Sequence, residues 1–105
     1  MRAAFSGDLA QVMALLDEGS DVNARDRDGD TALMFASFNG HFLIVKALLG
    51  HGADVHARAR NGWTALQAAK SKFHHKIARL LEQAEEQSLA EGMKRLVAEF
   101  EKHDE

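Results

Sequence analysis

Hydrophobic residues recur along this chain at three- and four-residue spacing, in short segments separated by stretches rich in glycine, aspartate and asparagine. This spacing places apolar side chains on one face of a helix, so residues 31–39 and 42–49 are predicted to form a helix pair. The expected core residues of this pair are Leu33, Ala36, Phe42, Val45, Leu48 and Leu49. Further helices are predicted over residues 2–6 and 9–16, and a second pair over residues 64–82.

The same unit occurs more than once. Residues 3–49 and 36–82, which are offset by 33 positions, are identical at 21 of 47 positions. The polar stretches at residues 19–30 and 52–63 are part of the unit, and their composition is typical of turns, so each is expected to form a β-hairpin-like finger between helix pairs. The chain is therefore predicted to be a stack of repeated helical units.

The central unit, GDTALMFASFNGHFLIVKALLGHGADVHA, resembles the ankyrin-repeat family, whose unit is a β-turn and two antiparallel helices over 33 residues. The shared motifs are Gly-x-Thr, an alanine-rich first helix, Gly-His, IVKALL and GADV. The resemblance covers residues 1 to about 84, and it implies an all-α solenoid of about 2.7 repeats. It also implies a non-enzymatic protein that binds protein partners.

Two features depart from the family pattern. The family's TPLH tetrapeptide appears as TALM at residues 31–34 and TALQ at residues 64–67, without the proline that starts the helix and the histidine that bonds between neighbours. Phe73 stands where a turn glycine is expected. Because a non-glycine residue at positive φ costs free energy, this turn is expected to be reshaped or its helices bent.

Residues 1–87 are expected to form the repeat stack, with a partial first repeat at 1–25, a second at 26–58 and a third at 59–87. The first repeat lacks its hairpin and most of its first helix. It is either a shortened N-terminal cap, with Asp8 and Gln11 on its polar face, or the beginning of a piece cut from a longer stack.

Residues 88–105 are predicted to form an amphipathic helix. Ser88 and Glu91 fit a capping box, and an apolar stripe follows at Leu89, Met93, Leu96, Val97 and Phe100. The preferred interpretation is a separate C-terminal capping helix folded back over the third repeat. The alternative is a single helix over residues 75–103, whose stripe pairs with a second copy of the chain.

Composition narrows the class of protein. The chain has 105 residues, 46% of them hydrophobic and 28% charged, as expected for one globular domain. It contains no cysteine and no apolar run of the length of a membrane span, and we expect an intracellular, cytoplasmic protein. The net charge is −4 over residues 1–30, 0 over 31–55, +6 over 56–81 and −5 over 82–105. The basic third repeat is expected to lie beside the acidic C-terminal segment.

Metal sites and catalysis find little support. Asp26, Asp28 and Asp30 alternate as in a calcium loop, but Thr31 and Ser37 stand where such a loop needs glycine and glutamate. His41 and His74 occupy the Gly-His position that the resemblance implies is structural; a zinc ion shared between them is the alternative. No serine lies in a nucleophile-elbow or phosphate-loop pattern, so no catalytic residue, cofactor or metal site is assigned.

A partner is expected to bind along the concave surface formed by the finger tips and the first helix of each pair, as the resemblance implies. The positions that vary there in the family correspond to Arg27, Asp28, Asp30, Phe38, Asn39, Arg60, Asn61, Trp63, Ser71 and Lys72. Phe38 and Trp63 lie off the predicted core faces, and aromatic residues flanked by arginines are typical of interface hot spots. The alternative is that Phe38 packs across the repeat junction and Trp63 shields a hairpin.

Three further features concern partners. Phe5 shares the repeat position of Phe38, Leu43 is an apolar residue on the outward side of its helix, and Asn23 sits where the family's asparaginyl hydroxylase acts. The bases of the third repeat resemble a nucleic-acid footprint, but the chain is acidic and has no nucleic-acid-binding motif. We therefore predict a protein-recognition module; the competing hypothesis is a structural homodimer.

Overall fold

The structure, a computed structural model, describes residue 4 and residues 7–102 of the chain. Within this part every regular element is a helix. The elements are α2 (Leu9–Asp17), α3 (Ala32–Asn39), α4 (Phe42–Gly50), α5 (Ala65–Ser71) and α6 (His75–Lys102). The predicted helix over residues 2–6 lies outside the described residues except for Ala4, which is helical and buried.

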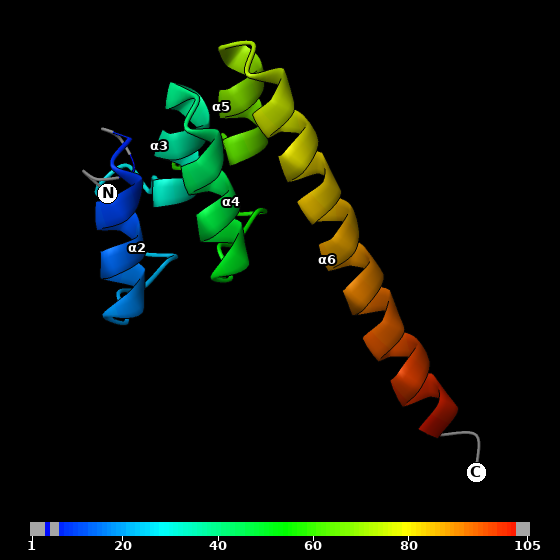
Figure 1. The fold of residues 1–105 in the computed structure, drawn as a ribbon. Coiled ribbons are helices and arrows are strands. Elements are labelled where there is room, and N and C mark those ends of the chain that lie inside the picture. The colour runs from blue at the N-terminus through cyan, green and yellow to red at the C-terminus, as the bar shows by residue number, and fades with distance from the viewer. Residues whose placement is uncertain (1–3, 5–6, 103–105) are drawn as a thin grey trace.

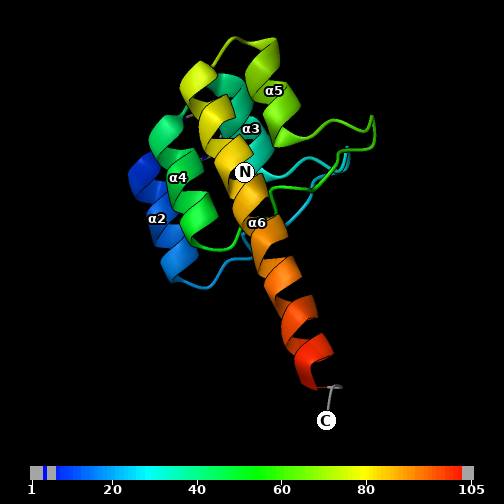
Figure 2. The same ribbon diagram turned by 90° about the vertical axis from the view of Figure 1, so that its right-hand side faces the viewer.

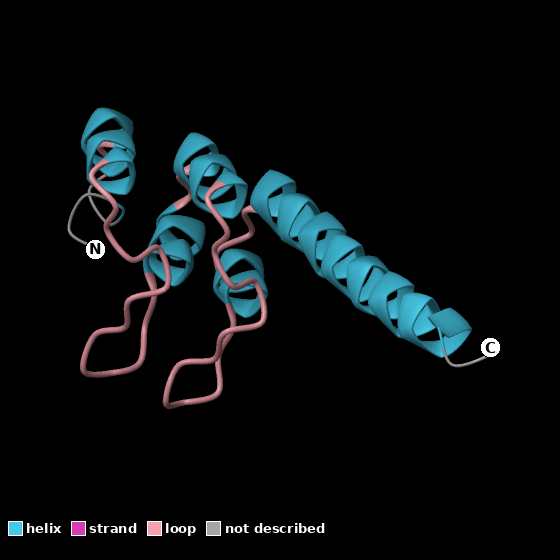
Figure 3. Ribbon diagram, turned by 90° about the horizontal axis from the view of Figure 1, so that it is seen from below, coloured by secondary structure: helices cyan, strands magenta, loops and turns pink. Residues whose placement is uncertain are grey.

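The helices lie in two layers. Helices α2, α4 and the first half of α6 form one layer, and α3 and α5 form the second (Figures 1 and 2). The two fingers, finger 1 (residues 19–30) and finger 2 (residues 52–63), project side by side from the edge of the second layer (Figure 3). This arrangement is the predicted all-α solenoid of helix pairs joined by finger loops.

The first helix of each pair begins at a threonine that caps it. The side chain of Thr31 accepts a hydrogen bond from the backbone N–H of Met34, and Thr64 does the same for Gln67. Gln67 also accepts from the backbone N–H of Thr64 at 3.0 Å, which completes a capping box. Both helices therefore start at the expected residues although neither carries the family's proline.

The core is an apolar layer shared by the helix pairs. Its fully buried side chains include Leu33, Ile44, Val45, Leu48 and Leu81. The expectation that Phe42 belongs to this core is wrong, because its side chain is 37% exposed. Phe42 lies in the first turn of α4, and Ile44 is the side chain that enters the core instead. A three- and four-residue stripe fits either residue, and packing against the neighbouring helices selects Ile44.

In the second and the third repeat, a histidine ring lies against a glycine of the preceding repeat. A Cβ atom added to Gly40 would lie 2.7 Å from the His74 ring, and one added to Gly7 would lie 2.6 Å from the His41 ring. His74 Nε2 also lies 3.1 Å from the backbone oxygen of Phe38. The structural interpretation of His74 is confirmed, since its ring joins two repeats.

The turn between α5 and α6 is not reshaped, contrary to the prediction from Phe73. This residue adopts φ 59°, in the same left-handed region as Gly40 at 78°. The hydrogen bond that closes the turn is also kept: His41 N donates to Ala36 O and His74 N donates to Ala69 O, both at 2.9 Å. The fold therefore holds Phe73 in an unfavourable backbone conformation while its side chain is 76% exposed.

The C-terminal segment does not fold back as a separate cap. Helix α6 runs without a break for 28 residues, about 42 Å, and its second half leaves the stack (Figure 1). Residues 77–90 contain neither glycine nor proline, so extending the packed first half of α6 is easier than nucleating a new helix at Ser88. The alternative of a single long helix is thus correct for these residues, while the division of the stack into repeats at residues 25, 58 and 87 stays a prediction.

Gly40→Ala is expected to destabilise the fold more than Gly52→Ala. Both glycines have positive φ, so alanine costs about 1 kcal/mol at either position. An alanine Cβ at position 52 meets nothing within 4 Å, whereas at position 40 it meets the His74 ring, which adds roughly 1–3 kcal/mol. Urea unfolding of the two variants measures the difference, and equal losses would show that the ring contact contributes nothing.

Phe73→Gly is expected to stabilise the protein by roughly 0.5–1 kcal/mol. Relief of the left-handed conformation contributes about 1–2 kcal/mol, and the added freedom of the unfolded chain removes part of it. Phe73→Ala is the control, because it removes the ring and keeps the strain. Thermal unfolding should give a higher Tm for the glycine variant alone; a gain shared by both variants would assign the effect to the exposed ring.

Candidate functional site

The two fingers are held together by hydrogen bonds from two side chains, Asn23 and Arg25, and by one bond between backbone groups. The Asn23 side chain accepts from Asp54 N at 2.7 Å and donates to Gly52 O at 3.4 Å. Arg25 donates to Arg58 O at 2.6 Å. Near the finger tips, Arg60 N donates to Asp28 O at 2.9 Å. These bonds fix the spacing of the fingers and hence the shape of the surface beside them.

A groove lies where finger 2 meets α3 and α5. It has a volume of about 340 Å³ and is mostly apolar. Its lining residues are Asp30, Met34, Phe35, Phe38, Asn61, Trp63 and Ala68. Phe38 and Trp63 are the large exposed side chains, at 41% and 43%, and the ammonium group of Lys72 lies 4.9 Å from the centre of the Phe38 ring. The volume is at the lower end of the range for binding pockets, about 300–1,000 Å³.

The comparison with protein families supports the fold assignment. A family model described as ankyrin repeats (3 copies) matches residues 1–90. The chain belongs to the ankyrin-repeat family. A comparison with curated proteins found no match. Ankyrin repeats are generally protein–protein interaction modules, and the family is typically non-enzymatic.

The groove of this ankyrin-repeat protein contains part of the predicted partner-binding set. Asp30, Phe38, Asn61 and Trp63 line it, and Lys72 contacts it through Phe38. The remaining five are not among the groove residues: Arg27, Asp28, Asn39, Arg60 and Ser71. In two of them the side chain bonds to its own helix, since Asn39 donates to Phe35 O and Ser71 to Ala68 O. Phe5 lies outside the described residues.

Three further residues, Met34, Phe35 and Ala68, form part of the groove wall but are not among the predicted site residues. Met34 follows the TAL motif at the position where the family pattern has histidine, and this apolar replacement was the available signal. Phe35 and Ala68 share one repeat position on the first helices. Their shared position shows that the groove runs between equivalent faces of neighbouring repeats.

An acidic cluster lies at one end of the groove. The carboxylates of Asp26, Asp28 and Asp30 lie within 4.8 Å of one another, the one group of potential metal-ligating side chains found among the described residues. Asp26 accepts hydrogen bonds from the backbone N–H groups of Asp28 and Asp30 at 3.0 and 2.9 Å, so it closes the turn of finger 1. Burial, followed by repulsion from Asp26 and Asp28, raises the pKa of Asp30 above its ordinary value of 3.8.

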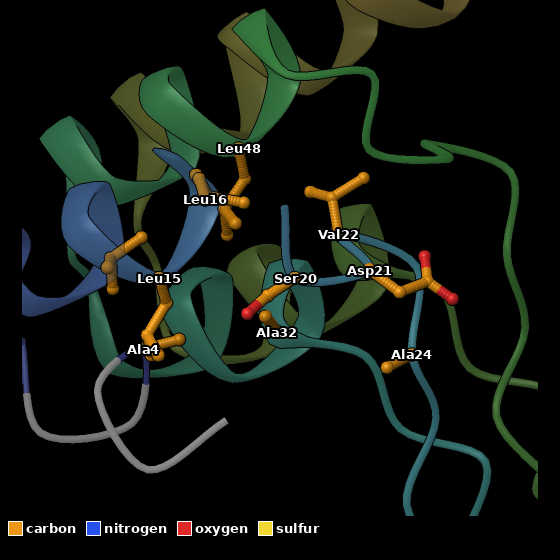
Figure 4. A pocket seen from close by; sticks show the side chains of 10 residues that line it. Ala4, Leu15, Leu16, Ser20, Asp21, Val22, Ala24, Ala32 and Leu48 are labelled. Atoms are coloured by element: carbon orange, nitrogen blue, oxygen red, sulfur yellow. The ribbon is translucent and has the colours of Figure 1, made fainter. Parts of the chain in front are cut away.

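Two other hollows are less suited to binding. The one in Figure 4 lies beside α2, finger 1 and the start of α3; it is lined by Leu15, Leu16, Val22 and their neighbours and has a volume of only about 80 Å³. The second is a larger wedge of about 440 Å³ between finger 2 and α6, with mainly polar walls. No helix in the described part of the chain has the length and apolar character needed to cross a membrane.

Asp30→Asn is expected to raise the Tm at pH 7 and to leave it unchanged near pH 3. A raised pKa means that the folded protein holds the proton more tightly than the unfolded chain, so the ionised carboxylate destabilises the fold. That cost is absent at low pH and grows as the pH rises through the folded-state pKa. Thermal melts across this range test the prediction, with Asp17→Asn on α2 as the control for removing one negative charge. An equal gain in both variants would contradict it.

Proposed function

We propose that this ankyrin-repeat protein binds a protein partner in the groove between finger 2 and helices α3 and α5. The observation that carries the proposal is the pair of exposed aromatic side chains, Phe38 and Trp63, on the walls of one apolar groove. Aromatic residues in partly enclosed apolar pockets are typical hot spots of protein interfaces. Lys72 and Asp30 supply charges of opposite sign at its edges, which can orient a partner.

Catalysis is not part of the proposal. The hydroxyl of Ser37 donates to Leu33 O at 2.6 Å and that of Ser71 to Ala68 O at 2.7 Å, so both side chains bond to their own helices. A nucleophilic serine would need an adjacent base that takes its proton. The proposal therefore assigns the groove to recognition of a protein surface.

Nucleic acid is a poor fit to the same groove. Asp30 lines it, and Asp26 and Asp28 lie within 4.8 Å of the Asp30 carboxylate, so a phosphate backbone along finger 1 would be repelled. A second candidate function, self-association, is favoured by the exposed apolar stripe of α6.

Capture of partners by immobilised protein should depend on the two aromatics. The chain with Phe38→Ser and Trp63→Ser is expected to capture at least about tenfold less of each specific partner. The reason is that each hot-spot side chain contributes about 2 kcal/mol or more to binding. Leu43→Ser is the matched control: Leu43 is more exposed, at 61%, but lies on α4 outside the groove. Quantitative mass spectrometry of proteins captured from the native host compares the variants. Partners lost with Leu43→Ser and kept by the double variant would place the interface on α4.

A further inference from the structure

The apolar stripe of α6 faces away from the protein's own stack. Ile77 and Leu81 are buried against the other helices, and Leu89 and Met93 lie roughly 120° around the helix from them at 100° per residue. The exposed fractions agree with this geometry: they lie between 55% and 68% for Leu89, Met93, Leu96 and Val97. Helix α6 is continuous and its second half leaves the stack (Figure 1), so the other helices of the described structure do not cover these side chains.

The charges of the third repeat and of α6 are largely unpaired in the described part of the structure. Residues 56–81 contain six lysines and arginines and no acid, and residues 82–91 contain four glutamates and no base. The expected neutralisation between them occurs at one place in the described structure, where Lys70 Nζ lies 3.5 Å from Glu82 Oε1. All the other Lys and Arg side chains of this repeat are exposed. Opposite charges of this extent attract a second molecule.

The groove and the outer half of α6 carry complementary apolar side chains and complementary charges. An amphipathic helix binds a groove through side chains at positions i, i+4, i+7 and i+8, the spacing of Leu89, Met93, Leu96 and Val97. The groove offers aromatic walls for such side chains, with Lys72 at one edge and the acidic cluster of finger 1 at the other. Helix α6 has the complementary order, with Glu85, Glu86 and Glu91 before the stripe centre and Lys94 after it.

We propose that residues 82–97 of α6 fill the groove of a second copy of this chain, with the glutamates toward the basic third repeat and Lys94 toward finger 1. The proposal rests on the proposed function, since it names the segment that the groove binds. A dimer formed by pairing α6 with α6 in parallel fits the charges less well, because Glu82, Glu85 and Glu86 of the two copies would lie side by side.

Trp63 allows a direct test, because it is the chain's only tryptophan and lines the groove. One full-length variant, Leu89→Ser with Met93→Ser, keeps the groove and the fluorophore but loses the stripe. A second, Trp63→Ser, keeps the stripe but has no tryptophan. Titrating the second into the first is expected to move the Trp63 emission to shorter wavelength, saturably, as the stripe of one chain covers the indole ring of the other.

The control for this titration is the chain with all three substitutions, which has neither stripe nor tryptophan and should cause no shift. All three side chains are exposed, so circular dichroism should show unchanged helicity in every variant. Lys72→Glu in the groove-bearing chain should weaken the response roughly two- to fivefold, while Lys46→Glu on α4 should leave it unchanged. A response that is insensitive to Lys72→Glu would overturn the proposed orientation.

Sedimentation of each variant alone separates the other outcomes. The variant that lacks the stripe and the variant that lacks Trp63 should each be monomeric alone and should associate when mixed. A Trp63→Ser chain that dimerises by itself would show that α6 pairs with α6, and the proposal would be wrong. If mixing gives neither an increase in mass nor a shift in emission, the inference of self-association is wrong. The proposed function is then decided by the capture experiment: it stands if Phe38→Ser with Trp63→Ser removes captured partners, and it is wrong if the partners remain.

Discussion

The contact on which the stack depends is the histidine ring that lies against a glycine of the preceding repeat. His74 closes over Gly40, and His41 over Gly7, so closely that a single added carbon would have to displace the ring. Glycine meets two requirements there, since the same residue must also adopt positive φ to end the first helix. A local backbone requirement and a contact between repeats thus meet at one position.

The third repeat breaks this rule at Phe73. The backbone keeps the left-handed turn, but a phenylalanine side chain occupies the place where a glycine would leave space for a ring. A histidine cannot lie against residue 73 as His74 lies against Gly40. The second half of α6 also departs from the repeat pattern, because a helix continues where that pattern would place a third finger. The regular stacking surface is therefore altered at this end of the stack.

Two surfaces are left uncovered in the described part of the structure. One is the groove beside finger 2, which the hydrogen bonds between the fingers hold open. The other is the outer face of α6, which carries exposed apolar side chains beyond the stack (Figure 1); the molecule extends 54 Å in its longest direction. Exposed apolar side chains grouped in this way are typical of interaction sites. The groove and α6 also carry charges of opposite sign, which favour contact between the two surfaces.

The sequence by itself determined the family, the helix pairs, the fingers and the exposure of Phe38 and Trp63, because repeat identity and helical periodicity depend on local spacing. Tertiary structure decided the rest. Packing chose Ile44 over Phe42 for the core, and the bond from His74 to Ala69 held Phe73 in a turn that its side chain disfavours. Propagation from a packed first half made α6 one helix. Only part of the ten predicted site residues gather at the groove. Which of them do so depends on how neighbouring helices and fingers pack, and no local pattern encodes that packing.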